Sequence, residues 1–428
     1  MTEIPSTTSQ IPVSDVPGSL RGVRVIEIGT SLAGPVATMI LGDLGAEVIK
    51  VERIGVGDDT RNWNPPAWNG VSTAFLGFNR NKRSLELDYK SPEGRQVLEE
   101  LVRSADVLVQ NLRPGAVEAA GFGWERLHEL NPRLVYVEMT GYGPVGPMAG
   151  EPAYDPVLQA YSGIVAMMPQ TEDGPMRVPL SILDKGTGMW AAIGALDALR
   201  RRDQTGNGSL VNVSLLNTAL DWVAGTMMNA NAGNQREKLG SGFPGMVPYG
   251  CYPARDGHVF ISAGNQKLWT QLITAMGVPA LNDRPGFGSN GDRSANRAAV
   301  EAAVAEVTRT FGRDELSALL AEARVPSAPI RPASELPADP QVQAIGGLRT
   351  IPHPEIEEFR TVGLPITVDG ALVPIQCAPP QLGADTRDVL ASLGYDEEAV
   401  DALLGAGVVG ASSERATEAT EAVSAVAR

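Results

Sequence analysis

One carboxylate, Asp184, stands at a position where its side chain could take part in catalysis. It follows the strand-like, mostly apolar run 178–183 and opens a long helical pattern that ends near Arg202. The dipole of a helix favours the ionised form of a carboxylate at its start. Gly186 and Gly188, which have no side chains, predict room for a ligand to approach. The same pattern also fits an ordinary Asp N-cap, and from the pattern alone that alternative stays open.

A second candidate is the pair Tyr154-Asp155, followed by Pro156. The phenol of Tyr154 can donate its O–H to a substrate oxygen. A loop aromatic packed on the domain surface fits the same residues, and the pattern alone favours it.

Basic residues form a third group. Asn79-Arg80-Asn81-Lys82-Arg83 follows Arg53 and Arg61, and Arg113 comes later. In a chain with a formal net charge of -15, such a cluster predicts phosphate binding through charge-assisted hydrogen bonds. A solvated basic loop is the alternative.

The glycine-containing loop 29–35 is a fourth candidate, because it follows a strand and opens a helix. Backbone N–H groups at such a turn can bind an anion, and Glu52 ends the next strand, where dinucleotide folds place their ribose-binding acid. The spacing is neither GxGxxG nor a P-loop, however. A tight strand–helix turn remains the alternative.

Composition excludes several classes of protein. The acidic charge disfavours a general nucleic-acid or anionic-membrane partner. Two distant cysteines and three isolated histidines form no disulfide framework and no metal motif, so no metal site is expected. The first 17 residues resemble neither a signal nor a transit peptide, and no apolar run reaches 18 residues. We therefore expect a cytoplasmic enzyme.

These residues need elements to position them, and the first half of the chain predicts alternating strands and helices. Strands are expected over 24–29, 46–52, 84–88, 105–111, 134–140 and 209–215. Helices are expected over 36–44, with Pro35 at the first position, over 91–104, with Ser91 as N-cap, over 184–202 and over 216–230. Met189, Ile193 and Leu196 predict one buried stripe on the long helix. The alternation indicates an α/β fold with a parallel sheet covered on both faces.

The pattern changes after about residue 230. Asp256-Gly257 predicts a hairpin within 252–263, and helical segments follow at 267–276, 294–323, 386–393 and 397–404. The expected organisation is a flexible tail (1–20), a large domain (21–224), a small domain (225–330), a linker that returns to and completes the large domain (331–410), and a second flexible tail (411–428).

Taken together, the motifs resemble one family, the family III CoA transferases or CaiB/BaiF group, which includes formyl-CoA and carnitine CoA transferases. The resemblance covers nearly all of residues 20–410. Its order and spacing are specific, although each piece alone is weak. The pieces are Gly34-Pro35, Gly45 to Glu52, Asn81-Lys82-Arg83-Ser84, Asn111 to Gly115, Gly141-Tyr142-Gly143, Asp184 with Gly186-Thr187-Gly188, Pro248-Tyr249-Gly250, and Leu382-Gly383 with Leu390 and Leu393-Gly394.

This resemblance implies a Rossmann-like large domain with a smaller α+β domain, in an interlocked homodimer. It implies Asp184 as the nucleophile that forms an aspartyl-CoA thioester, with acyl-CoA and a carboxylic acid as substrates and no tightly bound cofactor. Tyr154 and Asp155 would flank the site, and residues 240–245 would form a mobile lid, for which a plain flexible linker is the alternative. The expected contacts to CoA are Leu32, Ala33, Arg53, Asn81, Lys82, Arg83, Arg113 and Asp155.

One departure bears on the acid. Some family members carry Gln in the loop after the first strand, at about the position of Leu32. The Leu32 side chain cannot hydrogen-bond formate or oxalate, so a larger or less polar acid is expected.

Three rival functions remain. An α-methylacyl-CoA racemase resembles this chain in fold and shares the Asp, but its motif has His where Tyr154 stands and Glu near the position of Asn265. Both changes remove a titrating group suited to α-proton exchange. A non-catalytic acyl-CoA-binding protein and a nicotinamide-binding domain are the others. Asp184 with its glycines argues against the former, and the missing GxGxxG against the latter.

Overall fold

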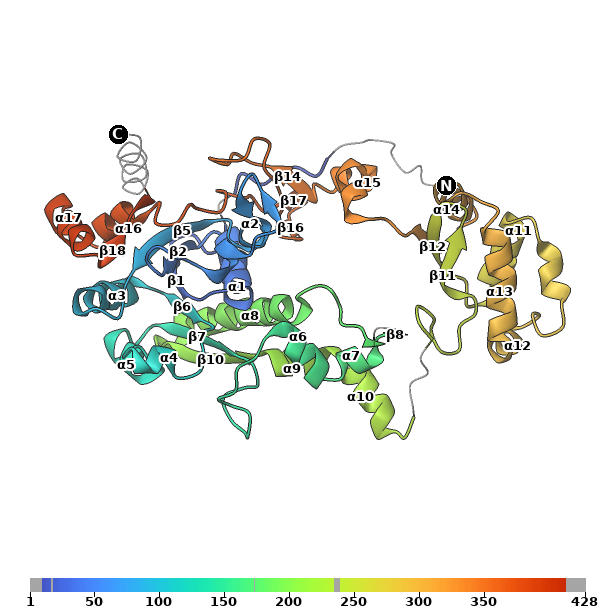
Figure 1. The fold of residues 1–428 in the computed structure, drawn as a ribbon, viewed down its shortest axis with the longest axis horizontal. Coiled ribbons are helices and arrows are strands. Elements are labelled where there is room, and N and C mark those ends of the chain that lie inside the picture. Colours follow the sequence, from blue (N-terminus) through green and yellow to red (C-terminus); the bar gives the residue numbers. More distant parts are fainter. Residues whose placement is uncertain (1–9, 17, 173, 235–238, 413–428) are drawn as a thin grey trace. The chain divides into compact units, whose positions relative to one another are not determined.

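A computed structural model of the chain describes residues 10–16, 18–172, 174–234 and 239–412 (Figure 1). The chain divides into two compact units. Unit 1 comprises Met1–Val165, Arg177–Ala224 and Pro340–Arg428, and unit 2 comprises Ala166–Met176 and Gly225–Asp339. Every candidate catalytic or CoA-binding residue named above belongs to unit 1, whereas the expected lid 240–245 and the motif Pro248-Tyr249-Gly250 belong to unit 2.

Unit 1 is built on a seven-stranded sheet with the order β10-β7-β6-β1-β2-β5-β18. Its members are β1 (Arg24–Ile28), β2 (Glu47–Glu52), β5 (Lys82–Leu87), β6 (Val107–Gln110), β7 (Val135–Thr140), β10 (Ser209–Ser214) and β18 (Val409–Gly410). All pairs are parallel except β18 with β5. The six predicted strands are confirmed, and the parallel strands follow the order of dinucleotide-binding folds.

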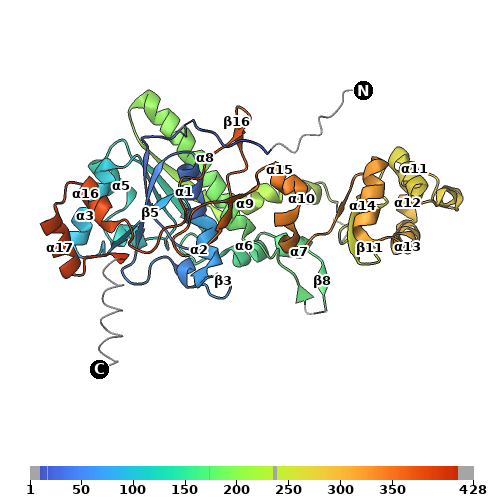
Figure 2. The same ribbon diagram turned by 90° about the horizontal axis from the view of Figure 1, so that it is seen from above.

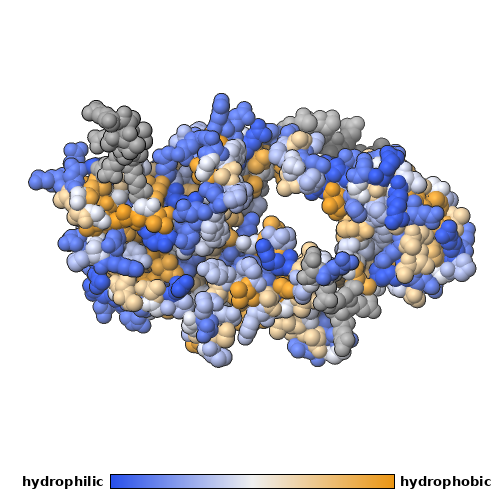
Figure 3. All heavy atoms as spheres, in the orientation of Figure 1, coloured by the Kyte–Doolittle hydropathy of each residue, from blue (hydrophilic) through white to orange (hydrophobic). Residues whose placement is uncertain are grey.

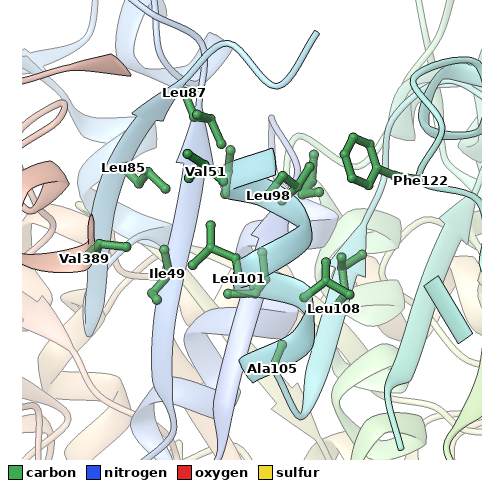
Figure 4. Close-up of a cluster of buried hydrophobic side chains, with 14 of the residues drawn as sticks. Ile49, Val51, Leu85, Leu87, Leu98, Leu101, Ala105, Leu108, Phe122 and Val389 are labelled. Carbon is green, nitrogen blue, oxygen red and sulfur yellow. The ribbon is translucent and has the colours of Figure 1, made fainter. Parts of the chain in front are cut away.

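Side chains alternate between the two faces of this sheet. On one face Ile49, Leu85 and Leu108 pack with the helices α3 (Pro92–Ser104), α5 (Trp124–Leu130), α16 (Thr386–Ser392) and α17 (Glu397–Gly405), as Figure 4 shows for part of this cluster. On the other face, valines such as Val48 and Val107 pack with α1 (Ala33–Asp43) and α8 (Ile182–Thr205). Burial on both faces explains the nearly continuous apolar strands.

The buried stripe of α8 differs from the predicted one. Small residues face the sheet and α1, among them Ala191, Ala195 and Ala198. Met189 and Ile193 are instead exposed by 55% and 51%. The prediction was wrong for these two residues, whereas Leu196 is partly buried against the same core. Alanines let the helix approach the sheet closely, so Met189 and Ile193 turn outward.

The ends of some helices also differ from those predicted from the sequence. The helix α1 begins at Ala33, so Pro35 is its third residue. Two helices, α9 (Leu215–Trp222) and α10 (Ala224–Asn231), replace the predicted 216–230 helix. No strand precedes α8 between residues 178 and 181. Ser91 caps α3 as predicted, and its side chain accepts a hydrogen bond from the N–H of Gly94 at 3.1 Å.

Unit 2 carries its own core around Trp269 and Val300. The predicted hairpin is confirmed, because β11 (Tyr249–Ala254) pairs with β12 (Gly257–Ser262), which pairs with β13 (Ser327–Pro329). The helices of this part of unit 2 are α11 (Gln266–Ala275), η2 (Pro279–Asp283), α12 (Asn290–Ala295), α13 (Arg297–Thr308), α14 (Arg313–Glu322) and η3 (Ala333–Ala338). The segment 294–323, predicted as one helical stretch, contains the end of α12 and the separate helices α13 and α14.

Shorter elements complete the chain, and Figure 2 shows many of them from above. They are η1 (Asp59–Asn62), β3 (Ala67–Trp68), β4 (Val71–Ser72), α2 (Thr73–Phe78), α4 (Ala116–Ala119), α6 (Asp155–Tyr161), α7 (Ile164–Met167), β8 (Gln170–Thr171), β9 (Gly174–Pro175), α15 (Pro340–Ala344), β14 (Leu348–Thr350), β15 (Arg360–Val362), β16 (Thr367–Val368) and β17 (Ala371–Leu372). None of the described helices has the length and apolar composition needed to cross a bilayer.

Candidate active site

Asp184 is the third residue of α8, not its cap. The N-cap position is Ser181, so the alternative that Asp184 is an ordinary N-cap is wrong. Residues four apart share one face of a helix, which places Asp184 on the face of Gly188. A Cβ atom at Gly188 would lie 2.8 Å from the carbonyl oxygen of Ala33 and 2.7 Å from Cγ1 of Val36. The helix face that carries Asp184 therefore turns toward the start of α1.

The first turn of α8 is capped from a distance by Asp155. This carboxylate is 2% exposed, and its Oδ2 accepts hydrogen bonds from the N–H groups of Leu183 at 2.6 Å and Asp184 at 3.1 Å. Its Oδ1 accepts from Nε2 of Gln159 at 2.5 Å. Both oxygens are engaged within the protein, which argues against the predicted CoA contact. Asp155 instead holds the backbone that carries Asp184.

The ionisation of Asp184 departs from the helix-dipole expectation. Burial, with a further contribution from the negative charge of Asp155, raises the pKa of Asp184 to about 7. Among the described residues no side chain or backbone group donates a hydrogen bond to its carboxylate. Desolvation without a compensating donor is the kind of environment that raises the pKa of a carboxyl group. Asp184 is thus a partly ionised acid near neutral pH with its oxygens free to react.

The two glycines serve packing, not ligand approach. Both are buried in α8. A Cβ atom at Gly186 would lie 2.6 Å from the ring of Trp222 and 2.9 Å from Cγ2 of Thr218, while the space beside Gly188 is filled by α1. The prediction that they leave room for a ligand was wrong, because that room is already occupied by neighbouring helices.

Two N–H groups of the loop after β1 are engaged by the protein. Thr30 donates its N–H to Oδ1 of Asn111 at 3.0 Å, and Ser31 donates its N–H to Oδ1 of Asp58 at 3.2 Å. The Asn111 amide also lies against Gly29 and Gly34, in the crevice between β1 and β6 where dinucleotide folds bind a pyrophosphate. These contacts occupy the N–H groups of Thr30 and Ser31, but no side chain caps the start of α1, so the expected anion site stays a prediction. The side chains of Leu32 and Ala33, next in the chain, are buried.

Asn81 and Lys82 are buried structural residues, which argues against their predicted phosphate contacts. Asn81 donates from Nδ2 to Asp43 at 2.7 Å and accepts at Oδ1 from the N–H groups of Gln376 and Cys377. It thereby attaches the chain that returns after unit 2. Lys82 pairs with Glu27 at 2.8 Å, and both side chains are fully buried. Desolvation is the larger influence on Lys82 and lowers its pKa to about 8.

Glu52 is also unavailable to a ligand. Arg61 binds it through two hydrogen bonds, Nε to Oε2 at 2.8 Å and Nη2 to Oε1 at 2.7 Å. Ser84 donates to the same carboxylate at 2.7 Å. This acid therefore anchors the segment after β2 and does not face a ribose.

Three predicted cations remain accessible. Arg113 is exposed in the turn after β6, and Arg53 is exposed although it pairs with Asp59. Arg83 is partly exposed and pairs with Glu47 at 2.7 Å. Tyr154, immediately before α6, is 62% exposed, so its phenol is open to solvent next to the residue that caps α8.

Two predicted features belong to unit 2. The stretch 240–245 is tied to its own unit, because Ser241 accepts from the N–H of Cys251 at 2.8 Å and Arg297 donates to the carbonyl oxygen of Phe243 at 2.8 Å. Asn265, which stands near a racemase glutamate, is the N-cap of α11 and accepts from the N–H of Leu268 at 2.9 Å. In the described part of the chain no cluster of His, Cys, Asp or Glu could hold a metal ion.

Sequence reasoning missed several residues that shape the site, chiefly Asn111, Asp58 and Gln159. Asn111 stood inside a quoted motif, so its position after a strand neighbouring β1 was a usable signal. Gln159 follows Asp155 by one helical turn, which is also visible in the sequence. Asp58 lies in an irregular segment, and nothing local indicates its contacts.

Comparisons with known proteins agree with this geometry. The model of "CoA-transferase family III" matches residues 20–386. The human protein named succinyl-CoA:glutarate CoA-transferase is 33% identical over 91% of this chain and 90% of its own length. Succinyl-CoA–D-citramalate CoA-transferase of Chloroflexus aurantiacus is 32% identical over 88% of this chain and 94% of its own length.

A solved structure supports the same assignment. The crystal structure of a CAIB/BAIF family protein from Brucella suis superposes with a TM-score of 0.82 and 33% identity, and it covers 88% of this chain and all of that one. The mostly parallel α/β sheet predicted from the sequence is therefore confirmed by a structural relative. The chain belongs to CoA-transferase family III and is a CoA transferase.

Proposed function

We propose that this enzyme moves coenzyme A between an acyl-CoA and a free carboxylic acid through a covalent intermediate on Asp184. The observation that carries the proposal is the Asp184 carboxylate itself. It stands in the first turn of α8, receives no hydrogen bond from the described residues, and has its pKa raised to about 7. A carboxylate of raised pKa is a stronger nucleophile once ionised, and half of it is ionised near neutral pH.

The proposed reaction proceeds by four acyl transfers. The Asp184 carboxylate attacks the thioester carbonyl of the donor, which releases CoA thiolate and leaves a mixed anhydride. The thiolate attacks the aspartyl carbonyl of that anhydride, giving the aspartyl-CoA thioester and the free donor acid. The acceptor carboxylate then attacks this thioester and expels the thiolate. Attack of the thiolate on the acceptor carbonyl yields the new acyl-CoA and restores Asp184.

Positioning of the carboxylate is the contribution that the fold makes in this proposal. Asp155 fixes the first turn of α8 by accepting hydrogen bonds from the N–H groups of Leu183 and Asp184. Gly188 lets the helix pack closely against α1. Covalent catalysis gains most when the nucleophile is held in one attack geometry. Tyr154, exposed beside Asp155, is the proposed O–H donor to the oxyanion formed at each attack. Arg53, Arg83 and Arg113 are the proposed contacts of the CoA phosphates.

We propose succinyl-CoA as the donor and a dicarboxylic acid of glutarate size as the acceptor. The support comes from the relatives named above, which are succinyl-CoA transferases with glutarate and D-citramalate as the partner acids. Leu32 at the loop position where some members carry Gln supports the choice of an acid larger than formate or oxalate.

The test is mass spectrometry of the protein after brief incubation with succinyl-CoA and quenching with hydroxylamine. Hydroxylamine converts an aspartyl thioester to a hydroxamate, and we expect this modification on the peptide that contains Asp184. Asp184→Ala should lack both the modification and CoA exchange into glutarate. Asp203→Ala, which removes an exposed carboxylate from the last turn of the same helix, should behave as the wild type.

Two outcomes would contradict the proposal. Exchange by Asp184→Ala at the wild-type rate would remove Asp184 from the mechanism. An unmodified wild-type protein that incorporates deuterium at the α-carbon of a 2-methylacyl-CoA would instead support the racemase.

We further propose that two copies of the chain form the working enzyme. The support is the outer face of α8, where Met189, Trp190 and Ile193 are exposed by 55%, 43% and 51%. Figure 3 shows hydrophobic residues interspersed with hydrophilic ones on the face of the molecule turned to the viewer. Apolar residues clustered on an exposed helix face are typical of a protein interface, and a second copy of this chain is the proposed partner.

A further inference from the structure

A buried ionic network lies beneath the loop that joins β1 to α1. Glu27 pairs with Lys50 at 2.5 Å, and Lys50 pairs with Asp58 at 2.7 Å. Lys82 completes the group by pairing with Glu27, and none of these four side chains is exposed to solvent. Two ammonium groups thus face two carboxylates, so the charges balance. Burial of four charges is costly unless the geometry is well satisfied, which raises the question of what the network holds.

The network makes direct bonds to the loop. The Asp58 Oδ1 atom accepts from the N–H of Ser31 at 3.2 Å and from Oγ1 of Thr30 at 3.3 Å. The Lys50 ammonium donates to the carbonyl oxygen of Gly29 at 3.1 Å. The hydroxyl of Thr30 also accepts from the N–H of Asp59 at 3.0 Å. Three successive loop residues are therefore tied to the buried pair.

These bonds hold an unfavourable backbone conformation. Ser31 has a φ of 67°, in the left-handed region that residues with a side chain seldom adopt. Such a conformation persists where surrounding contacts determine it. Two residues later the chain enters α1 at Ala33, whose carbonyl oxygen packs against Gly188 on the Asp184 face of α8. The position of the loop is thus transmitted to the start of α1 beside Asp184.

We propose that Asp58, held by Lys50, is a positioning residue for the reaction on Asp184. It acts through Thr30 and Ser31 and makes no contact with substrate itself. Loss of its bonds to the loop shifts the start of α1 relative to α8, and with it the surface that the Asp184 carboxylate faces. The inference rests on the proposed function, because it assigns a role in that same site.

The first test removes one hydroxyl. Thr30→Val deletes the group that donates to Asp58 and accepts from Asp59, whereas Thr30→Ser keeps it. Thr205→Val is the matched control, since Thr205 also uses its hydroxyl for a local backbone bond, at the far end of α8. We expect Thr30→Val to lower kcat roughly tenfold or more, because small displacements of reacting groups are costly. The KM for succinyl-CoA should stay nearly constant, Thr30→Ser should restore kcat, and Thr205→Val should match the wild type.

The second test neutralises the carboxylate. Asp58→Asn should lower kcat by a similar factor. Its matched control is Asp106→Asn. Asp106 also pairs with a basic side chain, Arg202, and accepts a backbone N–H, but it lies before β6 at the amino ends of the parallel strands, whereas Asp58 follows the carboxyl end of β2. Asp106→Asn should reduce thermal stability without the selective loss of kcat. If Asp58→Asn fails to fold, the comparison of Thr30→Val with Thr30→Ser, at a half-buried position, still tests the positioning role.

The outcomes separate this inference from the proposed function. Wild-type kcat in Thr30→Val, or an equal loss in Thr30→Ser or Thr205→Val, would overturn the positioning role while Asp184→Ala remains inactive. An active Asp184→Ala would overturn the proposed function, and with it the role assigned to Asp58.

Discussion

Asp184 is only partly ionised near neutral pH, because burial and the charge of Asp155 raise its pKa to about 7. In the proposed mechanism Asp184 must be deprotonated to attack, so the rate of adduct formation should fall about tenfold per pH unit below 7 and level off above it. Single-turnover mass spectrometry with succinyl-CoA between pH 5.5 and 9 measures this profile. A rate that stays constant from pH 6 to 9 would contradict the role of Asp184 ionisation.

Asp155 contributes a charge as well as a cap, and the two effects can be separated. Asp155→Asn removes the negative charge and keeps one oxygen for the N–H groups of Leu183 and Asp184, although its amide nitrogen loses the bond from Nε2 of Gln159. Because that charge raises the pKa of Asp184, the midpoint of the pH profile should move to lower pH. Asp203→Asn, an exposed change in the last turn of the same helix, should leave the midpoint in place. An unmoved midpoint in Asp155→Asn would assign the raised pKa to burial alone.

A raised pKa in the folded state also has a consequence for stability. The ionised Asp184 is disfavoured in the native protein, so the penalty is present above pH 7 and disappears as pH falls toward the ordinary value of 3.8. Asp184→Asn should therefore increase the free energy of unfolding at pH 8, by about 1–3 kcal/mol after allowance for partial exposure. Urea unfolding at pH 8 and pH 5 should show the gain shrinking at the lower pH. A gain that is equal at both pH values would speak against this cause.

At the scale of elements, the position of Asp184 depends on how closely α8 packs against α1. A Cβ atom at Gly188 would meet Val36 at 2.7 Å and the backbone oxygen of Ala33 at 2.8 Å. Gly188→Ala should destabilise the protein by about 1–3 kcal/mol, as overpacking does, and should lower kcat. Gly77→Ala, in α2 with open space around the added methyl group, should not destabilise and should gain up to about 1 kcal/mol, because Ala favours the helix. Thermal melting and steady-state kinetics of both variants test this, and an unaffected Gly188→Ala would contradict the packing argument.

Local sequence signals predicted the elements well and their environments less well. Ser91 caps its helix and Asp256-Gly257 makes its hairpin, because each signal acts within a few residues. The exposed face of α8 could not be predicted this way. Whether Ala191 or Ile193 turns inward depends on how near the sheet and α1 approach, and that distance is set by residues far away in the sequence.

At the scale of the whole molecule, the chain leaves unit 1 after Ala224 and returns at Pro340. Asn81 accepts hydrogen bonds from the returning chain at Gln376 and Cys377, almost 300 residues later. A run of basic residues gave no local indication of this contact, so the sequence favoured phosphate binding there. The start of a long helix near Asp184 was predicted and is confirmed, because α8 begins at Ile182, whereas the chemical role of Asp184 stays a prediction. The contacts of Asp155 and Asp58 join segments far apart in the sequence, and no spacing rule describes them.

The outer face of α8 leads to the last prediction, the association of two chains. Replacing Ile193, which is 51% exposed, by Glu should cost the folded monomer little, because a charge at a solvent-exposed helix position is well hydrated. A dimer that buries this face would instead have to desolvate the charge, and association should weaken strongly. Sedimentation should give twice the 45.1 kDa chain mass for the wild type and a lower mass for Ile193→Glu. Val145→Glu, at an exposed apolar residue in a loop, is the matched control and should leave the mass unchanged. A wild-type protein that sediments as a single chain would contradict the dimer, and a dimeric Ile193→Glu would place the interface on another surface.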